Sequence, residues 1–118
     1  IHRDSMVQAD GTKLKVCTEI DGEKAAQIML VSGSDQGGLY HPNWRENLKF
    51  AMKLQRRMNL LYPTLARPID FRKERFNTHT TTASIIVEVG STGNTLEEAL
   101  AGARFMAKAL GDMMRFIK

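Results

Sequence analysis

The sequence predicts an α/β domain in which helices flank a mostly parallel β-sheet. The first observation is a short run of β-branched residues, Ile85, Ile86, Val87 and Val89, that surrounds a single carboxylate, Glu88. Such a run is typical of a strand that is buried on both faces. The second observation is the order of periodic segments along the chain, which is strand, strand, helix, strand, strand, helix.

The length of the chain allows one domain. With 118 residues it can bury one core but not two, and it contains no internal repeat, low-complexity tract or linker. Hydrophobic residues make up 42% and charged residues 25%, as in an ordinary globular domain. The chain begins without an initiator Met, at Ile1-His2-Arg3-Asp4, so we expect it to be a piece of a longer protein.

Charge and residue usage narrow the classes of partner. The net charge is +4, which suggests a nucleic acid, an anionic membrane or an anionic cell-wall polymer. Only two Tyr and one Trp are present, and no basic run is interleaved with aromatic residues, so a stacking platform for single-stranded nucleic acid is not expected. A single Cys excludes an intrachain disulfide, and no apolar run reaches 18 residues.

The first third of the chain predicts two strands and a loop. Apolar and polar residues alternate over residues 13–20, which indicates a half-exposed strand that ends at the turn Asp21-Gly22. Residues 25–32 predict a second, more buried strand. The glycine-rich stretch 33–38 that follows is interpreted as a mobile loop, with a binding loop as the alternative, and no Gly-Lys-Ser/Thr follows it.

A long helix is predicted after His41-Pro42. Asn43 is the expected N-cap, with Glu46 completing a capping box, and Pro63 ends the helix. The face predicted to pack on the sheet carries Trp44, Leu48, Ala51, Leu54, Met58 and Leu61. The other face carries Arg45, Lys49, Lys53, Arg56 and Arg57, interpreted as a solvated face, with an anion-binding face as the alternative.

The second half predicts two extended segments and a second helix. Residues 67–72 predict a short extended segment, and residues 75–82 a polar loop that leads into the Glu88 strand. Thr95 and Glu98 form a capping box at the start of the last helix. Its apolar face is predicted to carry Leu96, Ala99, Leu100, Ala103, Met106, Ala107, Leu110, Met113 and Ile117.

Glu88 is the first candidate for chemistry. It lies near the carboxyl end of its predicted strand, where ligands gather in open α/β sheets, and a buried carboxylate needs a partner or a task. The alternative is a Glu on an edge strand that reaches water. His2, at a probable strand end, could face the same cleft as a metal ligand, whereas His41 is expected in a turn and His79 in solvent. Cys17 has no obvious base beside it, and no Gly-x-Ser-x-Gly elbow is present.

Several motifs occur together, in order, over nearly the whole chain. They are Ile1-His2-Arg3-Asp4, His41-Pro42-Asn43-Trp44-Arg45-Glu46-Asn47, Tyr62-Pro63, Arg67-Pro68-Ile69, Arg75-Phe76-Asn77, Ile86-Val87-Glu88-Val89-Gly90-Ser91 and Gly93-Asn94-Thr95-Leu96-Glu97-Glu98-Ala99. With these motifs the chain resembles the C-terminal part of the stage II sporulation protein P family. That family is similar to the zinc-dependent N-acetylmuramoyl-L-alanine amidases of the bacterial cell wall.

The resemblance implies a fold, a reaction and a site. The fold would be zinc amidase-like, with residues 1–118 forming a single partial catalytic domain. The reaction would be hydrolysis of the amide bond between N-acetylmuramic acid and L-alanine, and possibly of peptide cross-links, during septal wall thinning and engulfment. By motif position His2 matches a zinc ligand and Glu88 the catalytic carboxylate, while His41 and Asn77 match positions to which we assign a cleft-lining, substrate-binding role.

The resemblance also implies partners and a location. The expected partners are peptidoglycan, a sporulation lytic transglycosylase and a membrane scaffold, with no nucleic acid. The parent protein would be membrane-anchored and would act at the extracytoplasmic face of the bacterial cell membrane, at the sporulation septum.

One departure from the family leaves an alternative open. The family's other His and Glu zinc ligands lie upstream of Ile1-His2-Arg3-Asp4, so we expect this chain alone to lack activity. The alternative function is therefore a non-catalytic peptidoglycan-binding fragment. A small basic nucleic-acid-binding domain is the other rival, and the spread of Lys and Arg over several elements disfavours it.

Overall fold

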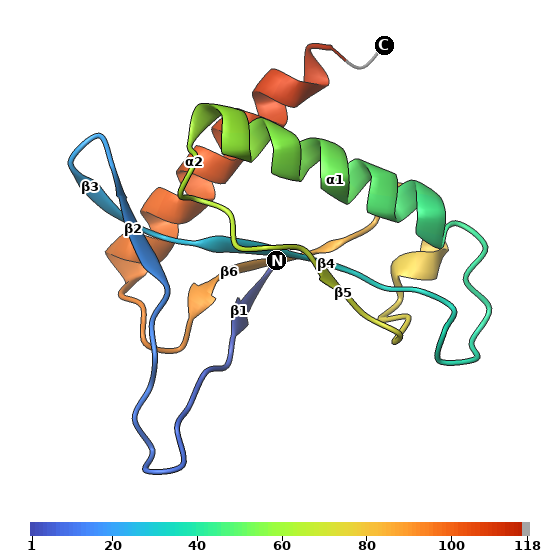
Figure 1. Ribbon diagram of the computed structural model, residues 1–118, viewed down its shortest axis with the longest axis horizontal. Helices are drawn as coiled ribbons and strands as arrows, with labels where there is room; N and C mark the ends of the chain where they lie inside the picture. The colour runs from blue at the N-terminus through green and yellow to red at the C-terminus, as the bar shows by residue number, and fades with distance from the viewer. Residues whose placement is uncertain (117–118) are drawn as a thin grey trace.

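The computed structural model describes residues 1–116, which form a sheet layer, a helix layer and a small hairpin. The strands are β1 (His2–Asp4), β2 (Cys17–Ile20), β3 (Glu23–Ala26), β4 (Ile28–Ser32), β5 (Asp70–Phe71) and β6 (Ile86–Ser91). The helices are α1 (Trp44–Leu61), the short 3₁₀ helix η1 (Thr78–Thr80) and α2 (Leu96–Met114). Figure 1 shows α1 and α2 crossing each other beside the strands.

The main sheet has the order β1-β6-β4-β5 and confirms the α/β prediction. β1 pairs with β6 and β5 pairs with β4 in parallel, as predicted for a mostly parallel sheet. The central pair, β4 with β6, is antiparallel, so the sheet is mixed. β6 therefore lies inside the sheet with a strand on each side, which excludes the edge-strand alternative for Glu88.

Both helices cover one face of this sheet. Ile28 and Leu30 of β4 and Val89 of β6 belong to the same core cluster as Leu54 of α1 and Phe105 of α2. Side chains alternate between the two faces of a strand, so Met29 and Glu88 point to the other face. No helix covers that face along β4 and β6. Within residues 1–116 the helices therefore flank the sheet on one face only.

The strand predicted over residues 25–32 is divided at Gln27. Its backbone N–H donates to the carbonyl of Val16, while its carbonyl accepts from the N–H of Gly90, so the chain passes from one sheet to the other at this residue. β3 pairs with β2 in a separate antiparallel hairpin. The predicted turn at Asp21-Gly22 is confirmed, with positive φ values of 52° and 80°.

Helix α1 begins where the sequence predicts, but the predicted capping box is wrong. Asn43 is the N-cap residue without a side-chain cap hydrogen bond, and Glu46 forms an ion pair with Lys49. The predicted apolar face is confirmed at its centre, where Ala51, Leu54 and Met58 are buried; Trp44 and Leu48 are half-buried and Leu61 is exposed. A polar residue, Asn47, completes the buried face because its amide bonds to two backbone groups of the segment before β6.

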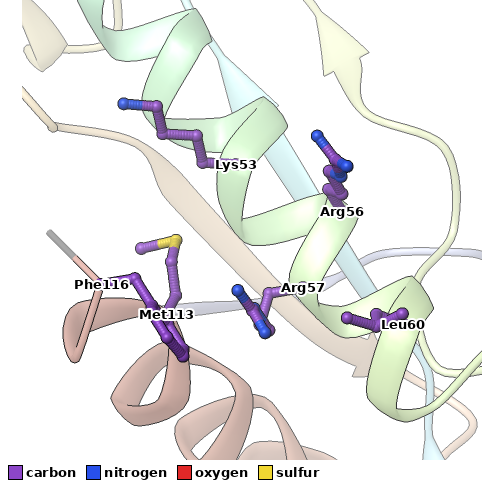
Figure 2. Close-up of a pocket in the computed structure, with 6 residues that line it drawn as sticks. All are labelled: Lys53, Arg56, Arg57, Leu60, Met113 and Phe116. Atoms are coloured by element: carbon purple, nitrogen blue, oxygen red, sulfur yellow. The ribbon is translucent and has the colours of Figure 1, made fainter.

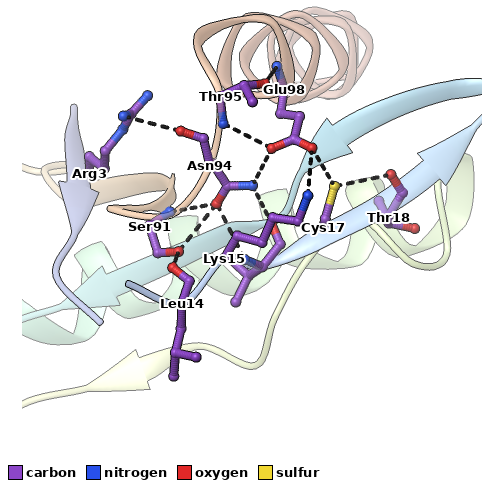
Figure 3. Close-up of polar contacts among 10 residues, drawn as sticks. Arg3, Leu14, Lys15, Cys17, Thr18, Ser91, Asn94, Thr95 and Glu98 are labelled. Carbon is purple, nitrogen blue, oxygen red and sulfur yellow. Dashed lines mark hydrogen bonds and ion pairs between the residues drawn. The ribbon is translucent and has the colours of Figure 1, made fainter. Parts of the chain in front are cut away.

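Helix α2 begins with the predicted capping box, which is confirmed. Figure 3 shows how Glu98 gathers four donors there. One carboxylate oxygen accepts from the Thr95 N–H (2.9 Å) and the Asn94 amide (3.1 Å), and the other accepts from Lys15 (3.3 Å) and Cys17 (3.4 Å). The bonds from Lys15 and Cys17 join α2 to β2 and to the segment just before it.

The face predicted for α2 is partly wrong. Leu96 and Leu100 are 63% and 58% exposed, while the buried residues are Glu98, Ala101, Gly102, Phe105, Met106, Ala109 and Met113. The buried Glu98 sets the rotation of the helix, and small residues one turn later let its backbone approach β3. A Cβ atom on Gly102 would collide with the carbonyl of Ala26. Ile117 lies outside the described residues.

Over the described part of the chain, neither helix combines the length and apolar character that crossing a membrane requires.

Candidate functional site

The open face of the main sheet holds a cleft of about 350 Å³. Its floor is formed by alternate residues of the two central strands, Met29 and Val31 of β4 and Ile86 and Glu88 of β6. Its polar wall is formed by His2, Asp4, Arg67, Asp70 and Arg72. The cleft therefore brings together residues that are up to 86 positions apart, on a face with no helix over β4 and β6.

His2 and Glu88 are brought together as the sequence predicts. They are register partners in the parallel pairing of β1 with β6, so their side chains project from the same face of the sheet. His2 is exposed, whereas Glu88 is half-buried. An imidazole at the rim thus lies beside a carboxylate that is farther inside.

The carboxylate of Glu88 has an unsatisfied oxygen. Its Oε2 atom is buried and has no hydrogen-bond partner. Burial raises the pKa of Glu88, the nearby carboxylate of Asp4 raises it further, and the positive charges of His2 and Arg67 oppose these effects. A buried oxygen without a partner is costly, and a raised pKa makes a carboxylate a stronger proton acceptor than it is in water.

The other carboxylates of the cleft are neutralised by ion pairs. Asp4 lies 3.4 Å from the Arg67 guanidinium, and Asp70 lies 3.5 Å from that of Arg72. Among the cleft residues described, Glu88 is the carboxylate without such a pair.

A second cleft, of about 480 Å³, adjoins the first and shares His2, Phe76 and Ile86 with it. It adds Arg75 and Asn77 as polar lining. The backbone here is unusual, since Phe76 and Asn77 both have positive φ values, 60° and 80°. Two successive side chains in the left-handed region cost energy and are found most often at functional sites. Asn77, predicted to line the cleft, thus lines the same cleft as His2.

His41, also predicted to bind substrate, lies elsewhere. It is 1% exposed, and its Nε2 atom lies 2.9 Å from the Thr78 hydroxyl. That hydroxyl donates its hydrogen to the carbonyl of Arg75 (2.7 Å), so it accepts from the Nε2–H group of His41. Asn47 holds the same turn by donating to the Thr78 carbonyl (2.8 Å).

The place of His41 indicates a supporting role. Burial lowers its pKa, and the neighbouring His79 and Arg75 lower it further, so the imidazole is neutral at pH 7. It lines a separate surface pocket with Leu39 and Asp35 and does not line either of the two clefts beside His2. His41 therefore supports the turn that presents Arg75 and Asn77. His79 is half-buried and lies edge-on to His41, with ring centroids 6.3 Å apart.

The described residues do not by themselves make a zinc site. A catalytic zinc takes three protein ligands and a water molecule. Residues 1–116 contain no group of three or more His, Cys, Asp or Glu side chains that could hold a metal ion. Of the ligands that a zinc ion needs, the cleft supplies the imidazole of His2, beside the carboxylate of Glu88.

Sequence reasoning missed the polar support of the site. Arg67, Asp70 and Arg72 lie in a segment for which only extended structure is predicted, and the pair of Arg67 with Asp4 joins residues 63 positions apart. Asn47 and Thr78 lie 31 residues apart, and no local pattern links them. One usable signal was present, namely a polar residue in the middle of an apolar helix face at position 47.

Comparison with known proteins gives one match. The model of the family described as Stage II sporulation protein P matches residues 1–111. No curated protein and no solved structure matched the chain.

Proposed function

Because the chain belongs to the stage II sporulation protein P family, we propose that it is part of a zinc-dependent N-acetylmuramoyl-L-alanine amidase. It would hydrolyse the amide bonds, and also the peptide cross-links, of peptidoglycan during septal wall thinning and engulfment. The observation that carries the proposal is the carboxylate of Glu88, which lies in an open cleft beside His2 with one buried oxygen unpaired.

In this proposal Glu88 transfers the proton. Its carboxylate accepts a proton from the water that adds to the amide carbonyl, and it then gives that proton to the departing nitrogen as the carbon–nitrogen bond breaks. The products are the lactyl carboxylate and the free amine of L-alanine. The raised pKa of Glu88 suits a group that must first bind and then release a proton.

His2 is proposed as one ligand of the zinc ion. The other ligands would come from outside residues 1–116, because these residues hold no group of three candidates.

Asn77 and Arg75 are proposed to contact the substrate in the adjoining cleft. Arg75 donates to the backbone carbonyl of Tyr40 (3.3 Å) and forms no ion pair among the described residues. A guanidinium group in that state can bind a carboxylate, and the peptide stems of peptidoglycan carry carboxylates. His41 is proposed to act indirectly, as a positioning residue for this turn.

The proposed setting follows the family. The protein would act on the extracytoplasmic face of the membrane at the sporulation septum, together with a lytic transglycosylase and a membrane scaffold. The second candidate function is a peptidoglycan-binding fragment without activity, which is favoured by the incomplete ligand set around His2.

The test measures zinc content and cleavage of a defined muramoyl peptide, on this chain and on a chain extended at its N-terminus. We expect the extended chain to bind about one zinc ion and to cleave, and the present chain to do neither. His2→Ala should lower the zinc content of the extended chain, and Glu88→Gln should retain zinc but lose turnover.

Glu97→Gln provides the matched control, since Glu97 is an exposed carboxylate on α2 that does not line the cleft. An extended chain without zinc, or a Glu88→Gln variant with full activity, would contradict the amidase proposal. Binding of peptidoglycan by an extended chain that neither holds zinc nor cleaves would support the second candidate.

A further inference from the structure

The net positive charge of this chain comes from one helix. Helix α1 contains five Lys or Arg residues and one Glu, and this excess equals the net charge of +4 of the whole chain. Basic residues occur on several elements, but those outside α1 are equal in number to the acidic residues there.

The basic residues lie on the side of α1 that faces away from the sheet. Arg45, Lys49, Lys53 and Arg56 are exposed and recur at spacings of four, four and three residues, which places them in one stripe. The stripe is about 16 Å long at the helical rise of 1.5 Å per residue. Within the described part of the chain, Lys53 and Arg56 have no ion-pair partner, whereas Arg57 is paired with Asp112 (3.1 Å).

A cleft of about 480 Å³ opens at the C-terminal half of this stripe. Figure 2 shows Lys53, Arg56, Arg57 and Leu60 along α1, with Met113 of α2 and Phe116 on the other side of the opening. Leu60 and Phe116 are 68% and 71% exposed, and Met52, on the same side of α1, is 57% exposed. Cationic and exposed apolar side chains are thus interleaved on one surface, which we call the α1 surface and define by Lys53, Arg56, Leu60, Met52 and Phe116.

The α1 surface and the Glu88 cleft face in opposite directions. The buried side of α1 packs on the Ile28 and Leu30 face of the sheet, and Glu88 projects from the other face. A partner that covers the α1 surface therefore leaves the cleft open.

We propose that the α1 surface docks on an anionic phospholipid bilayer. Its extended array of cations complements a plane of lipid phosphates, and each basic residue held near such a surface adds to the attraction. Its exposed apolar side chains enter the boundary between headgroups and acyl chains, as those of interfacial proteins do. A soluble anionic polymer would use the cations but gains nothing from Leu60 and Phe116.

The docking fixes an orientation. With α1 against the lipid, the sheet lies above it and the Glu88 cleft opens away from the bilayer. The docking depends on the charge and exposure of the α1 surface and not on the reaction at Glu88.

The test is sedimentation of the chain with vesicles. We expect it to bind vesicles of phosphatidylcholine that contain phosphatidylglycerol, to bind vesicles of pure phosphatidylcholine at least tenfold more weakly, and to dissociate as salt is raised. Lys53→Gln with Arg56→Gln should lower the partition coefficient about 25-fold, at about fivefold for each cation removed.

Two matched controls separate docking from general attraction. Lys13→Gln with Lys24→Gln removes the same charge from exposed positions outside α1 and should change binding by less than about fivefold. Leu60→Ser should weaken binding. Leu96→Ser should not, because Leu96 is similarly exposed but lies at the N-terminal end of α2, outside the α1 surface.

Three results would overturn the proposal. They are equal binding to neutral and anionic vesicles, equal losses in the two double variants, and binding to a soluble polyanion such as polyglutamate without binding to anionic vesicles. The last result would assign the surface to an acidic polymer or protein segment.

Discussion

Two glutamates ten residues apart have opposite pKa shifts and different environments in this molecule. Glu98, at the start of α2, is 5% exposed and accepts hydrogen bonds from Thr95, Asn94, Lys15 and Cys17. Its pKa is lowered to about 2 by these bonds, of which that from the Thr95 backbone contributes most. Glu88, in β6, is half-buried with an unpaired buried oxygen, and its pKa is raised.

The difference shows that burial alone does not decide what a carboxylate does. Glu98 is the more buried of the two, but four donors replace the water it has lost, so its charge is stable and fixed. Glu88 is more accessible, yet too few donors reach it to compensate for its partial burial. Glu98 therefore stabilises the structure. Glu88 has an unpaired oxygen, which a ligand or a proton can bind with a gain in free energy.

The largest expected effect separates the two residues by activity. In the extended, zinc-loaded chain, Glu88→Gln should reduce the turnover of a muramoyl peptide about 1,000-fold, since it removes the proton acceptor. It should not lower the free energy of unfolding, because Glu88 has few bonds to lose. Turnover and chemical denaturation of the same preparations measure both. A strong loss of stability without loss of turnover would reverse the assigned roles.

The second effect concerns Glu98. Glu98→Ala should reduce the free energy of unfolding by about 3 kcal/mol, since it leaves one N–H of the buried Asn94 amide and the Thr95 N–H without acceptors, while the other N–H of Asn94 keeps the Val16 carbonyl. Urea denaturation of the present chain measures the change. Glu97→Ala, one position away and exposed, is the control and should change stability by less than about 0.5 kcal/mol.

The third effect is the acid dependence of stability. The pKa of Glu98 is lower in the folded chain than in the unfolded chain, so its contribution is complete above about pH 4.5 and is lost as the pH falls toward about 2. We expect a loss of roughly 2 kcal/mol over this range, less than the full shift implies, because solvent screens the exposed Lys15 partner. Urea denaturation at several pH values should show a flatter profile for Glu98→Gln.

The smallest effect tests the capping box. Thr95→Ala removes the side chain that accepts from the Glu98 N–H (3.1 Å), and it should cost about 1 kcal/mol of unfolding free energy. Thr95→Ser retains the hydroxyl and should cost less than half as much. If both variants were equally destabilised, the side-chain cap would contribute little.

The sequence predicts the features that depend on local patterns. The Asp21-Gly22 turn, the Thr95 capping box and the strand around Glu88 are all read from neighbouring residues, and all are present. The sequence also predicts that His2 could face the same cleft as Glu88, and the two residues are register partners of β1 and β6.

The features that depend on distant contacts could not be predicted in this way. The division at Gln27 arises from hydrogen bonds to Val16 and Gly90, which no period in the sequence reveals. The rotation of α2 depends on Glu98, a residue that hydropathy assigns to the surface. In the same way, His41 has the residue type of a ligand, but its bond to Thr78, 37 positions away, places it in support of a turn.

Close glycine contacts join the parts of this fold. A Cβ atom would collide with the carbonyl of Glu74 if added to Gly33, with that of Leu14 if added to Gly93, and with that of Ala26 if added to Gly102. A carbonyl cannot rotate aside as a side chain can, so almost no residue other than glycine fits at these three positions. A library that randomises the whole chain should therefore lose diversity first at these positions.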